Sequence, residues 1–401
     1  MTAALLRPVT ERALALDALT AAFAATAAEH DREASFPFEN FRLLHEQGLL
    51  GLTVPKEFGG GGANLPETLE VVQAVARGEP ATALVLVMQY LFHVAVPGRG
   101  VDPAVYRRIA RDAVENGALV NALRVEPELG TPARGGLPGT VARRTPEGWR
   151  ISGHKLYSTG IPALTWLNVW GRTDEENPRA GGFLVHRDSP GITIVETWDH
   201  LGLRASGSHD VILEDVLVPF DHAVDLRLPS ALPTDSTNRA ERAGEIPPAF
   251  AVFAHWSAVL TAGIYDAVAR AARDWLVGWA AERKPANLGA PLSTLPRFQE
   301  AIGAIDGLLL SNRCLLDTAA QGGLDVVQAN LVKHLVTENA IQAVQKGLEI
   351  SGNPGITRHN PLERHYRHVL CGRIHTPQSD VVLTAAGRAA FAAHSQKKEN
   401  P

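Results

Sequence analysis

Cysteine and methionine are scarce in this 401-residue chain, which has two residues of each. Cys314 and Cys371 alone cannot build a disulfide framework or a metal cage made of cysteines. This low cysteine content is typical of a protein from a reducing compartment. We therefore expect a cytoplasmic location.

An excess of positive charge is also missing, because 38 lysines and arginines face 43 aspartates and glutamates. Proteins that bind nucleic acids or anionic membranes usually present a basic surface, so neither partner is expected here. The alanine-rich N-terminus carries Glu11 and Asp17 and lacks the basic-then-apolar order of a signal peptide. The most apolar window, residues 81–96, is shorter than the ~20 residues that span a bilayer, and we predict a buried helix there.

Metal-binding motifs are lacking as well. His365 and His368 are three residues apart on a predicted helix, and His359 and His375 flank them. No cysteine or carboxylate shares their spacing, as a zinc site would require. We expect no metal and interpret these histidines as part of a polar surface.

The first third of the chain has helical periodicity from Val9 to Gly117. Asp102 followed by Pro103 is a typical helix start, because the carboxylate caps the first turn and proline is favoured at the first helical position. We predict an N-terminal all-α domain over residues 1–117.

At residue 118 the pattern changes to short alternating or apolar runs between glycine, proline and acidic turns. Seven such runs are ALVNALRV, GTVARR, GWRISGHKLYS, WLNVWGR, GFLVHR, GITIVE and HDVILEDVLVP. They predict an antiparallel β barrel or sandwich over residues 118–225. Residues 226–248 are rich in proline, serine, threonine and charge, and we predict a connecting surface loop.

Helical periodicity returns after Pro248 and, with a helix after Pro361, predicts a four-helix bundle within residues 249–401. The three long segments are 249–282, 297–320 and 324–350. On the third segment, the apolar stripe that we expect to be buried consists of Val327, Leu331, Leu335, Val344 and Leu348.

The stretch from Ser351 to Gln378 follows this bundle helix and begins with a glycine- and proline-rich turn. Its polar residues are dense: Glu363, Arg364, His365, Arg367, His368, Arg373 and His375. This density next to flexible backbone indicates either a functional site or a solvated helix face.

Several strings, in this order, resemble the acyl-CoA dehydrogenase superfamily of flavoproteins. They are GLLGLTVPKEFGGGG, VEPELG, ISGHKLYSTG, GFLVHRDSPGI, LGLRASGSHDVILEDVLVP and EISGNPGITRHNPLERHYRH. The resemblance covers nearly the whole chain and implies a multidomain α+β fold in the order α, β, α. It also implies a small-molecule substrate, a homotetramer built through the C-terminal bundles, and a flavin between the β domain and the bundle. That flavin would be FAD, or reduced FMN if the chain resembles the monooxygenase relatives.

The resemblance places Tyr157, Ser158 and Thr159 at the isoalloxazine ring. An aromatic ring suits a flavin face by stacking, and a hydroxyl suits the N5 edge by hydrogen bonding. The alternative is a strand end with ordinary turn residues.

Other flavin contacts are implied with departures from the family pattern. Val125 replaces a flavin-contacting hydroxyl, while Gly130 and Thr131 would offer backbone N–H groups to the pyrophosphate. Gly352 belongs to the family's glycine-rich string, and the resemblance implies that it contacts the flavin. Arg283 resembles the arginine that binds the pyrophosphate of a neighbouring subunit, or it is simply a cation at a helix C-terminus.

The family's catalytic glutamate is missing, because counting from Arg367 its position is occupied by Thr376. The alternative position on the first bundle helix falls near Trp256. A hydroxyl cannot serve as the general base that removes a proton from carbon near neutral pH.

Two hypotheses follow. The first is a monooxygenase-type enzyme that uses reduced flavin from a flavin reductase and oxygen, since Arg373 to Thr376 match an R-x-H-T string of such relatives. His375, beside Thr376, would then donate or relay a proton. His93 would face the same pocket, or it is a core histidine.

The second hypothesis is an acyl-CoA dehydrogenase that passes electrons to an electron-transfer flavoprotein and uses a relocated base. Glu363 and Asp380 are the candidates for that base. A flavoprotein without catalytic activity is a third, weaker interpretation, since the Tyr157 and Thr159 positions are retained.

Overall fold

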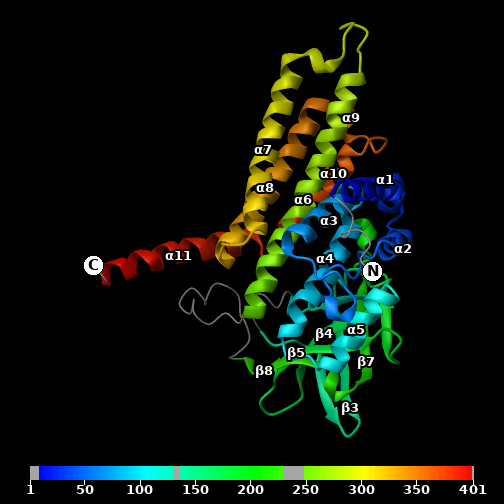
Figure 1. Cartoon of the computed structure of the whole chain (residues 1–401), viewed down its shortest axis with the longest axis vertical. Helices are drawn as coiled ribbons and strands as arrows, with labels where there is room; N and C mark the ends of the chain where they lie inside the picture. The colour runs from blue at the N-terminus through cyan, green and yellow to red at the C-terminus, as the bar shows by residue number, and fades with distance from the viewer. Residues whose placement is uncertain (1–8, 131–135, 230–247, 400–401) are drawn as a thin grey trace.

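The chain folds in the order helices, sheet, helices, which confirms the predicted α, β, α class (Figure 1). The computed structural model describes residues 9–130, 136–229 and 248–399. The predicted connector at 226–248 lies mostly outside these residues, and the predicted domain limits remain predictions.

The N-terminal part consists of five α-helices that pack on one another and on the bundle. They are α1 (Val9–Glu33), α2 (Phe38–Glu46), α3 (Leu65–Gly78), α4 (Pro80–Ala95) and α5 (Pro103–Glu115), with short 3₁₀ turns η1 (Lys56–Phe58) and η2 (Val96–Gly98). Asp102 caps α5 as predicted, since its carboxylate accepts the N–H groups of Ala104 and Val105 at 2.8 and 3.1 Å.

The middle part is one eight-stranded sheet in the order β6-β7-β3-β2-β4-β5-β8, with β1 paired to β4. Its strands are β1 (Leu119–Leu123), β2 (Val141–Thr145), β3 (Gly148–Lys155), β4 (Leu164–Thr173), β5 (Ala180–His186), β6 (Ile192–Val195), β7 (Asp210–Val218) and β8 (Ala223–Arg227). Five strand pairs are antiparallel, as predicted, but β4 pairs in parallel with both β1 and β2. The eighth strand, β8, was not predicted.

The C-terminal part is a helical bundle whose long helices run side by side away from the sheet (Figure 1). Its helices are α6 (Pro248–Glu282), α7 (Pro296–Ala320), α8 (Val326–Ser351), α9 (Asn353–Ile356), α10 (Leu362–Leu370) and α11 (Ser379–Glu399). Among the described residues, α11 projects from the body at the C-terminal end (Figure 1).

The buried face of α8 differs from the predicted stripe. Leu335 is 45% exposed, while Val327, Leu331 and Leu348 are half-buried and Val344 alone is fully buried. The apolar residues that face the bundle core are Ala329, Val332, Val336, Ala340, Ile341, Ala343 and Val344. Lys333 lies on this buried side and is only 3% exposed.

Two further expectations concern buried segments. His365 and His368 are 8% and 2% exposed, so the prediction of a histidine-rich surface was wrong; α10 turns both rings toward its packed side. Two windows, Pro80–Gly98 and the α6 helix, are long and apolar enough to cross a membrane. In the first, 78% of the window is buried inside the protein, as in a core helix, and in the second 44%.

Candidate functional site

The turn after β3 projects an aromatic side chain from the rim of the sheet. Tyr157 has a φ of 53°, which is uncommon for a residue with a bulky side chain, and its side chain is largely exposed. Hydrogen bonds hold the backbone on both sides, from Leu156 N–H to the Val125 carbonyl at 2.9 Å and from Ser158 N–H to the His209 carbonyl at 3.1 Å. The fold therefore fixes Tyr157 in an exposed position.

Two aromatic residues that were not predicted join Tyr157. Trp198 and His200 stack with ring centroids 3.7 Å apart, and Tyr157 meets them edge-on at 6.3 and 5.7 Å. The indole N–H of Trp198 donates to the Leu203 carbonyl at 3.1 Å, which fixes the ring. Tyr157, Trp198 and His200, here called the aromatic rim, form a surface suited to a planar ring.

A chain of hydroxyls lies beside the aromatic rim. Ser206 and Ser208 hydroxyls are 2.7 Å apart, and the Ser208 hydroxyl donates to that of Thr159 at 3.0 Å. Thr159 thus accepts one hydrogen bond and still has its own hydrogen to donate. The Ser158 hydroxyl is buried without a partner among the described residues. Both groups are suited to a polar ring edge.

The segment around Val125 is organised by a buried ion pair. Lys155 and Glu126 meet at 2.5 Å, and the Thr140 hydroxyl donates to the same carboxylate at 2.6 Å. Burial opposes ionisation, but these hydrogen bonds prevail and lower the pKa of Glu126. Burial lowers the pKa of Lys155 to about 8.

The expected phosphate-binding turn is closed on itself in this structure. Gly130, with a φ of 65°, donates its N–H to the Glu126 carbonyl at 2.9 Å. That N–H already has an acceptor, so a role in flavin binding remains a proposal. Thr131 lies outside the described residues.

His375 lies at the other predicted site, in the loop between α10 and α11. Its Nδ1 is 2.5 Å from the hydroxyl of Tyr265, a fully buried residue of α6. Burial, with the charge of Lys333 adding to it, lowers the pKa of His375 to about 4. The imidazole is therefore neutral near pH 7. Thr376, next in the chain, is exposed.

Lys333 anchors the His375 loop to α8. Its ammonium group donates to the carbonyls of Gly372, His375 and Pro377 at 2.8, 2.7 and 3.1 Å. Burial lowers its pKa to about 8. All three donors of the ammonium are used, so one buried cation fixes the backbone that carries His375.

His93 belongs to a different set of contacts. It is 1% exposed, and its ring lies 3.3 Å from the Gln89 amide and 3.4 Å from the Tyr106 hydroxyl. Burial lowers the pKa of His93 to about 3. These contacts place His93 inside the packing of α4 against α5 and not in the Tyr265–His375 pair.

Arg283 and Gly352 lie at the ends of α6 and α8, two bundle helices that pack against each other. Arg283 follows the last turn of α6 and is exposed, while Gly352 ends α8 with a φ of 62°. Ile350, near the end of α8, packs against a small apolar cluster that contains Ala280 of α6, Leu292 and Phe298. Within one chain the ends of α6 and α8 that carry Arg283 and Gly352 lie away from the sheet (Figure 1).

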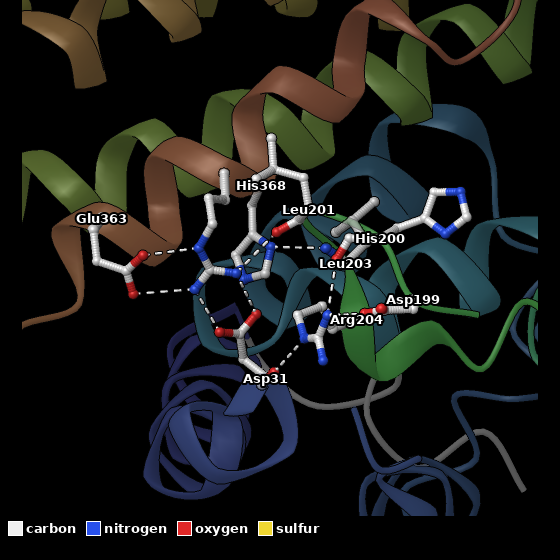
Figure 2. Close-up of polar contacts among 9 residues, drawn as sticks. Asp31, Asp199, His200, Leu201, Leu203, Arg204, Glu363 and His368 are labelled. Atoms are coloured by element: carbon white, nitrogen blue, oxygen red, sulfur yellow. Dashed lines mark hydrogen bonds and ion pairs between the residues drawn. The ribbon is translucent and has the colours of Figure 1, made fainter. Parts of the chain in front are cut away.

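An ion-pair junction joins the first helix, the loop after β6 and α10 (Figure 2). Arg367 contacts Asp31 through two hydrogen bonds of 2.9 and 2.5 Å and Glu363 through two of 2.8 and 3.0 Å, and it also donates to the Leu201 carbonyl at 2.9 Å. His368 Nδ1 accepts the Leu203 N–H at 3.0 Å. Because Leu201 and Leu203 continue from His200, the junction positions the aromatic rim.

Glu363, one of the two carboxylates considered as a relocated base, is engaged in an ion pair. Both carboxylate oxygens of Glu363 accept hydrogen bonds from one edge of the Arg367 guanidinium, through Nε and Nη2. Asp266, which was not predicted, is buried beside Tyr265, and burial raises its pKa; Arg270 and Asn312 hydrogen-bond it. In the described part of the chain, no group of three or more His, Cys, Asp or Glu side chains could hold a metal ion.

The aromatic rim, the free hydroxyls and the neutral His375 fit a flavin-dependent oxidoreductase. Models of the acyl-CoA dehydrogenase N-terminal, middle and C-terminal domains match residues 11–96, 124–216 and 251–391. The chain belongs to the acyl-CoA dehydrogenase superfamily.

Its relatives include two kinds of protein. The candidate acyl-CoA dehydrogenase YdbM of Bacillus subtilis is 34% identical over 381 residues, covering 92% of this chain and 93% of YdbM. L-evernosamine nitrososynthase of Micromonospora is 30% identical over 389 residues, covering 91% and 86%. A KijD3 structure in complex with FMN and a dTDP-linked amino-keto sugar superimposes with a TM-score of 0.78 at 29% identity, covering 98% and 97%.

Proposed function

We propose that this protein is a monooxygenase-type enzyme that oxygenates a small molecule with reduced flavin and dioxygen. The observation that carries the proposal is the loop at the family's base position. It presents the exposed hydroxyl of Thr376 beside His375, a neutral histidine held by Tyr265, where a dehydrogenase needs a carboxylate. The identity to a nitrososynthase adds support.

In this proposal the aromatic rim and Thr159 bind the flavin ring, which supplies electrons to oxygen. The Tyr265 hydroxyl needs an acceptor because it is buried, and the acceptor that it meets among the described residues is His375 Nδ1. The ring proton of His375 then lies on Nε2, from which it is relayed to the reacting atoms. Lys333 keeps the loop in place during this transfer.

The cofactor supply, the location and the assembly extend the proposal. A separate flavin reductase supplies reduced flavin, the enzyme works in the cytoplasm, and it assembles as a homotetramer through its bundles. In such an assembly Arg283 and Gly352 of one copy would reach the flavin of another, which would favour FAD over FMN.

The alternative is an acyl-CoA dehydrogenase with a relocated base and an electron-transfer flavoprotein as partner. The identity to YdbM favours it. The ion pair of Glu363 with Arg367 weighs against Glu363 as the base, because a carboxylate bound by a guanidinium is a poor proton acceptor.

The deciding experiment begins without air. Protein reconstituted with FAD is mixed with a panel of acyl-CoA thioesters while the flavin absorbance is recorded. Bleaching by any thioester would establish the dehydrogenase and end the monooxygenase proposal. We expect no bleaching, followed by slow return of the oxidised-flavin absorbance when protein with chemically reduced flavin meets air. Free reduced flavin, which reoxidises fast, is the control.

A further inference from the structure

A cavity of about 270 Å³ lies between β8 and the first turn of α6. Its polar lining comes from Arg99 on the loop after η2 and from Asp225 and Arg227 on β8. Neither the aromatic rim nor His375 belongs to it. The cavity is therefore a place that the proposed chemistry does not yet use.

Positive charge exceeds negative charge at this cavity. Asp225 pairs with Arg99 at 3.5 Å and also with Arg227, so two guanidinium groups share one carboxylate. Arg124 is close enough for the charge of Arg99 to add to burial in lowering its pKa, to about 10. Among the described residues, no carboxylate is paired with Arg124. Arg124 does not line the cavity, but its proximity to Arg99 adds a third cation next to the pair of guanidinium groups that share Asp225.

Unpaired buried groups lie beside these cations. The Arg124 guanidinium sits 5.1 Å from the Trp170 ring centroid, and Arg124 Nε and Trp170 Nε1 are both buried without an acceptor in the described ranges. Trp170 pairs across the sheet with Gly182, and Gly182 pairs with Val224, the neighbour of Asp225. Buried N–H groups are almost always paired in folded proteins, so two orphans next to surplus positive charge indicate a missing anionic acceptor.

We propose that Arg99, Arg124 and Arg227 bind the anionic group, a phosphate or a carboxylate, of the substrate. Guanidinium groups bind both oxyanions through paired hydrogen bonds. Val125, the neighbour of Arg124, forms a β-bridge with Leu156, the neighbour of Tyr157. An anion held by Arg124 therefore lies near the turn that carries Tyr157. The inference rests on the proposed function in one respect, because it assigns the cavity to the substrate of that enzyme.

The test is direct binding to the full-length protein by calorimetry, with inorganic pyrophosphate and with citrate as separate probes. We expect saturable binding of at least one probe, and the stronger probe identifies phosphate or carboxylate as the natural group. Arg124→Leu and Arg99→Ala should each weaken binding by about 10-fold, the loss expected for one charge-assisted contact. Arg143→Ala, which removes an exposed partner of Asp215, is the matched control and should bind like the unaltered protein.

The proposal would be overturned if neither probe binds saturably. It would also be overturned if the Arg99 and Arg124 variants bind the probe as tightly as the unaltered protein does. Flavin binding, followed by quenching of flavin fluorescence, should stay unchanged in both variants and verifies that they are folded. Anion binding by a protein that fails the oxygen test would leave the pocket standing and reject only the proposed reaction.

Discussion

Tyr265 and His375, 110 residues apart in the chain, are joined by a hydrogen bond of 2.5 Å between the phenol oxygen and Nδ1. Tyr265 is fully buried in α6, and burial raises its pKa well above the ordinary value, so the phenol stays protonated. The bond therefore sets the orientation and the tautomer of the one histidine to which we assign proton transfer.

The first prediction concerns this pair. His375→Gln should lower the rate of substrate oxygenation by about 100-fold, the usual contribution of a positioned proton-transfer group. Tyr265→Phe keeps the ring but frees Nδ1, and we expect a smaller loss with a changed pH profile, because the imidazole can then change tautomer. Steady-state rates from pH 5 to 9 measure both. His359→Gln, at an exposed position, is the control, and equal rates for all variants would remove His375 from the mechanism.

The second prediction concerns acid stability. The folded protein holds the pKa of His93 at about 3, while the unfolded chain has the ordinary value of 6.5. As the pH falls through this window the unfolded state binds a proton that the folded state does not, so stability decreases, by about 2 kcal/mol between pH 7 and 5 and by at most about 5 kcal/mol in all from this residue. His93→Gln should therefore flatten the acid limb of urea-unfolding free energies between pH 7 and 5. The same acid dependence in the variant would contradict this assignment.

The third prediction tests Lys333 as a positioning residue. Lys333→Met has a similar length and leaves three carbonyls without their donor, and we expect a stability loss of about 3 kcal/mol. Oxygenation should fall further than flavin affinity, since the loop carries His375 and not the aromatic rim. Lys346→Met on the same helix should change neither quantity. A Lys333 variant with full activity would show that the loop holds its shape without the ammonium group.

The fourth prediction concerns the junction of Figure 2. Arg367→Met leaves the carboxylates of Asp31 and Glu363 without their cation, and we expect a loss of about 2 kcal/mol at this half-buried position. A double-mutant cycle with Asp31→Asn should give a coupling energy of about 1 kcal/mol. Additive effects would mean that the two residues act independently. Flavin affinity should fall with Arg367→Met, because the loop that carries His200 loses its anchor.

The fifth prediction separates FAD from FMN. Arg283→Ala should weaken FAD binding by about 10-fold and leave FMN binding unchanged, because only FAD carries the pyrophosphate that reaches beyond the first phosphate. Fluorescence titrations with both flavins, at concentrations where the oligomer is verified by light scattering, measure this. Lys284→Ala, the neighbouring cation, is the control. Equal loss for both flavins would assign Arg283 to assembly alone.

Much of the fold is predictable from the sequence because helices and strands have different apolar periods. The bounds of α6 and α7 lie within a residue of the predicted 249–282 and 297–320. The predicted apolar stripe of α8 was wrong, because the core face of this helix is built from Ala329, Val332 and Val336, while the larger Leu335 faces solvent. A stripe defined by the largest apolar residues places Lys333 on the solvent side, whereas Lys333 lies on the buried side of the helix.

The site is less predictable because it depends on contacts between distant segments. Trp198 and His200 sit in a loop without periodicity, and their position follows from Arg367 and His368 more than 160 residues away. In the sequence, Tyr265 cannot be distinguished from the other apolar residues of a long helix. The burial of His368 also cannot be predicted from the neighbouring sequence, because it depends on the hydrogen bond that the distant Leu203 N–H donates to His368 Nδ1.

The residues that hold the His375 loop and the aromatic rim lie on two helices that pack against each other. Lys333 of α8 holds the His375 loop, and Arg367 and His368 of α10 hold the loop behind the aromatic rim, while α10 packs directly on α8. A shift of α10 along α8 would therefore move the two loops relative to each other. Evolution or design could retune the distance between flavin and proton donor by repacking that single helix contact, with no change to any residue that touches the reaction.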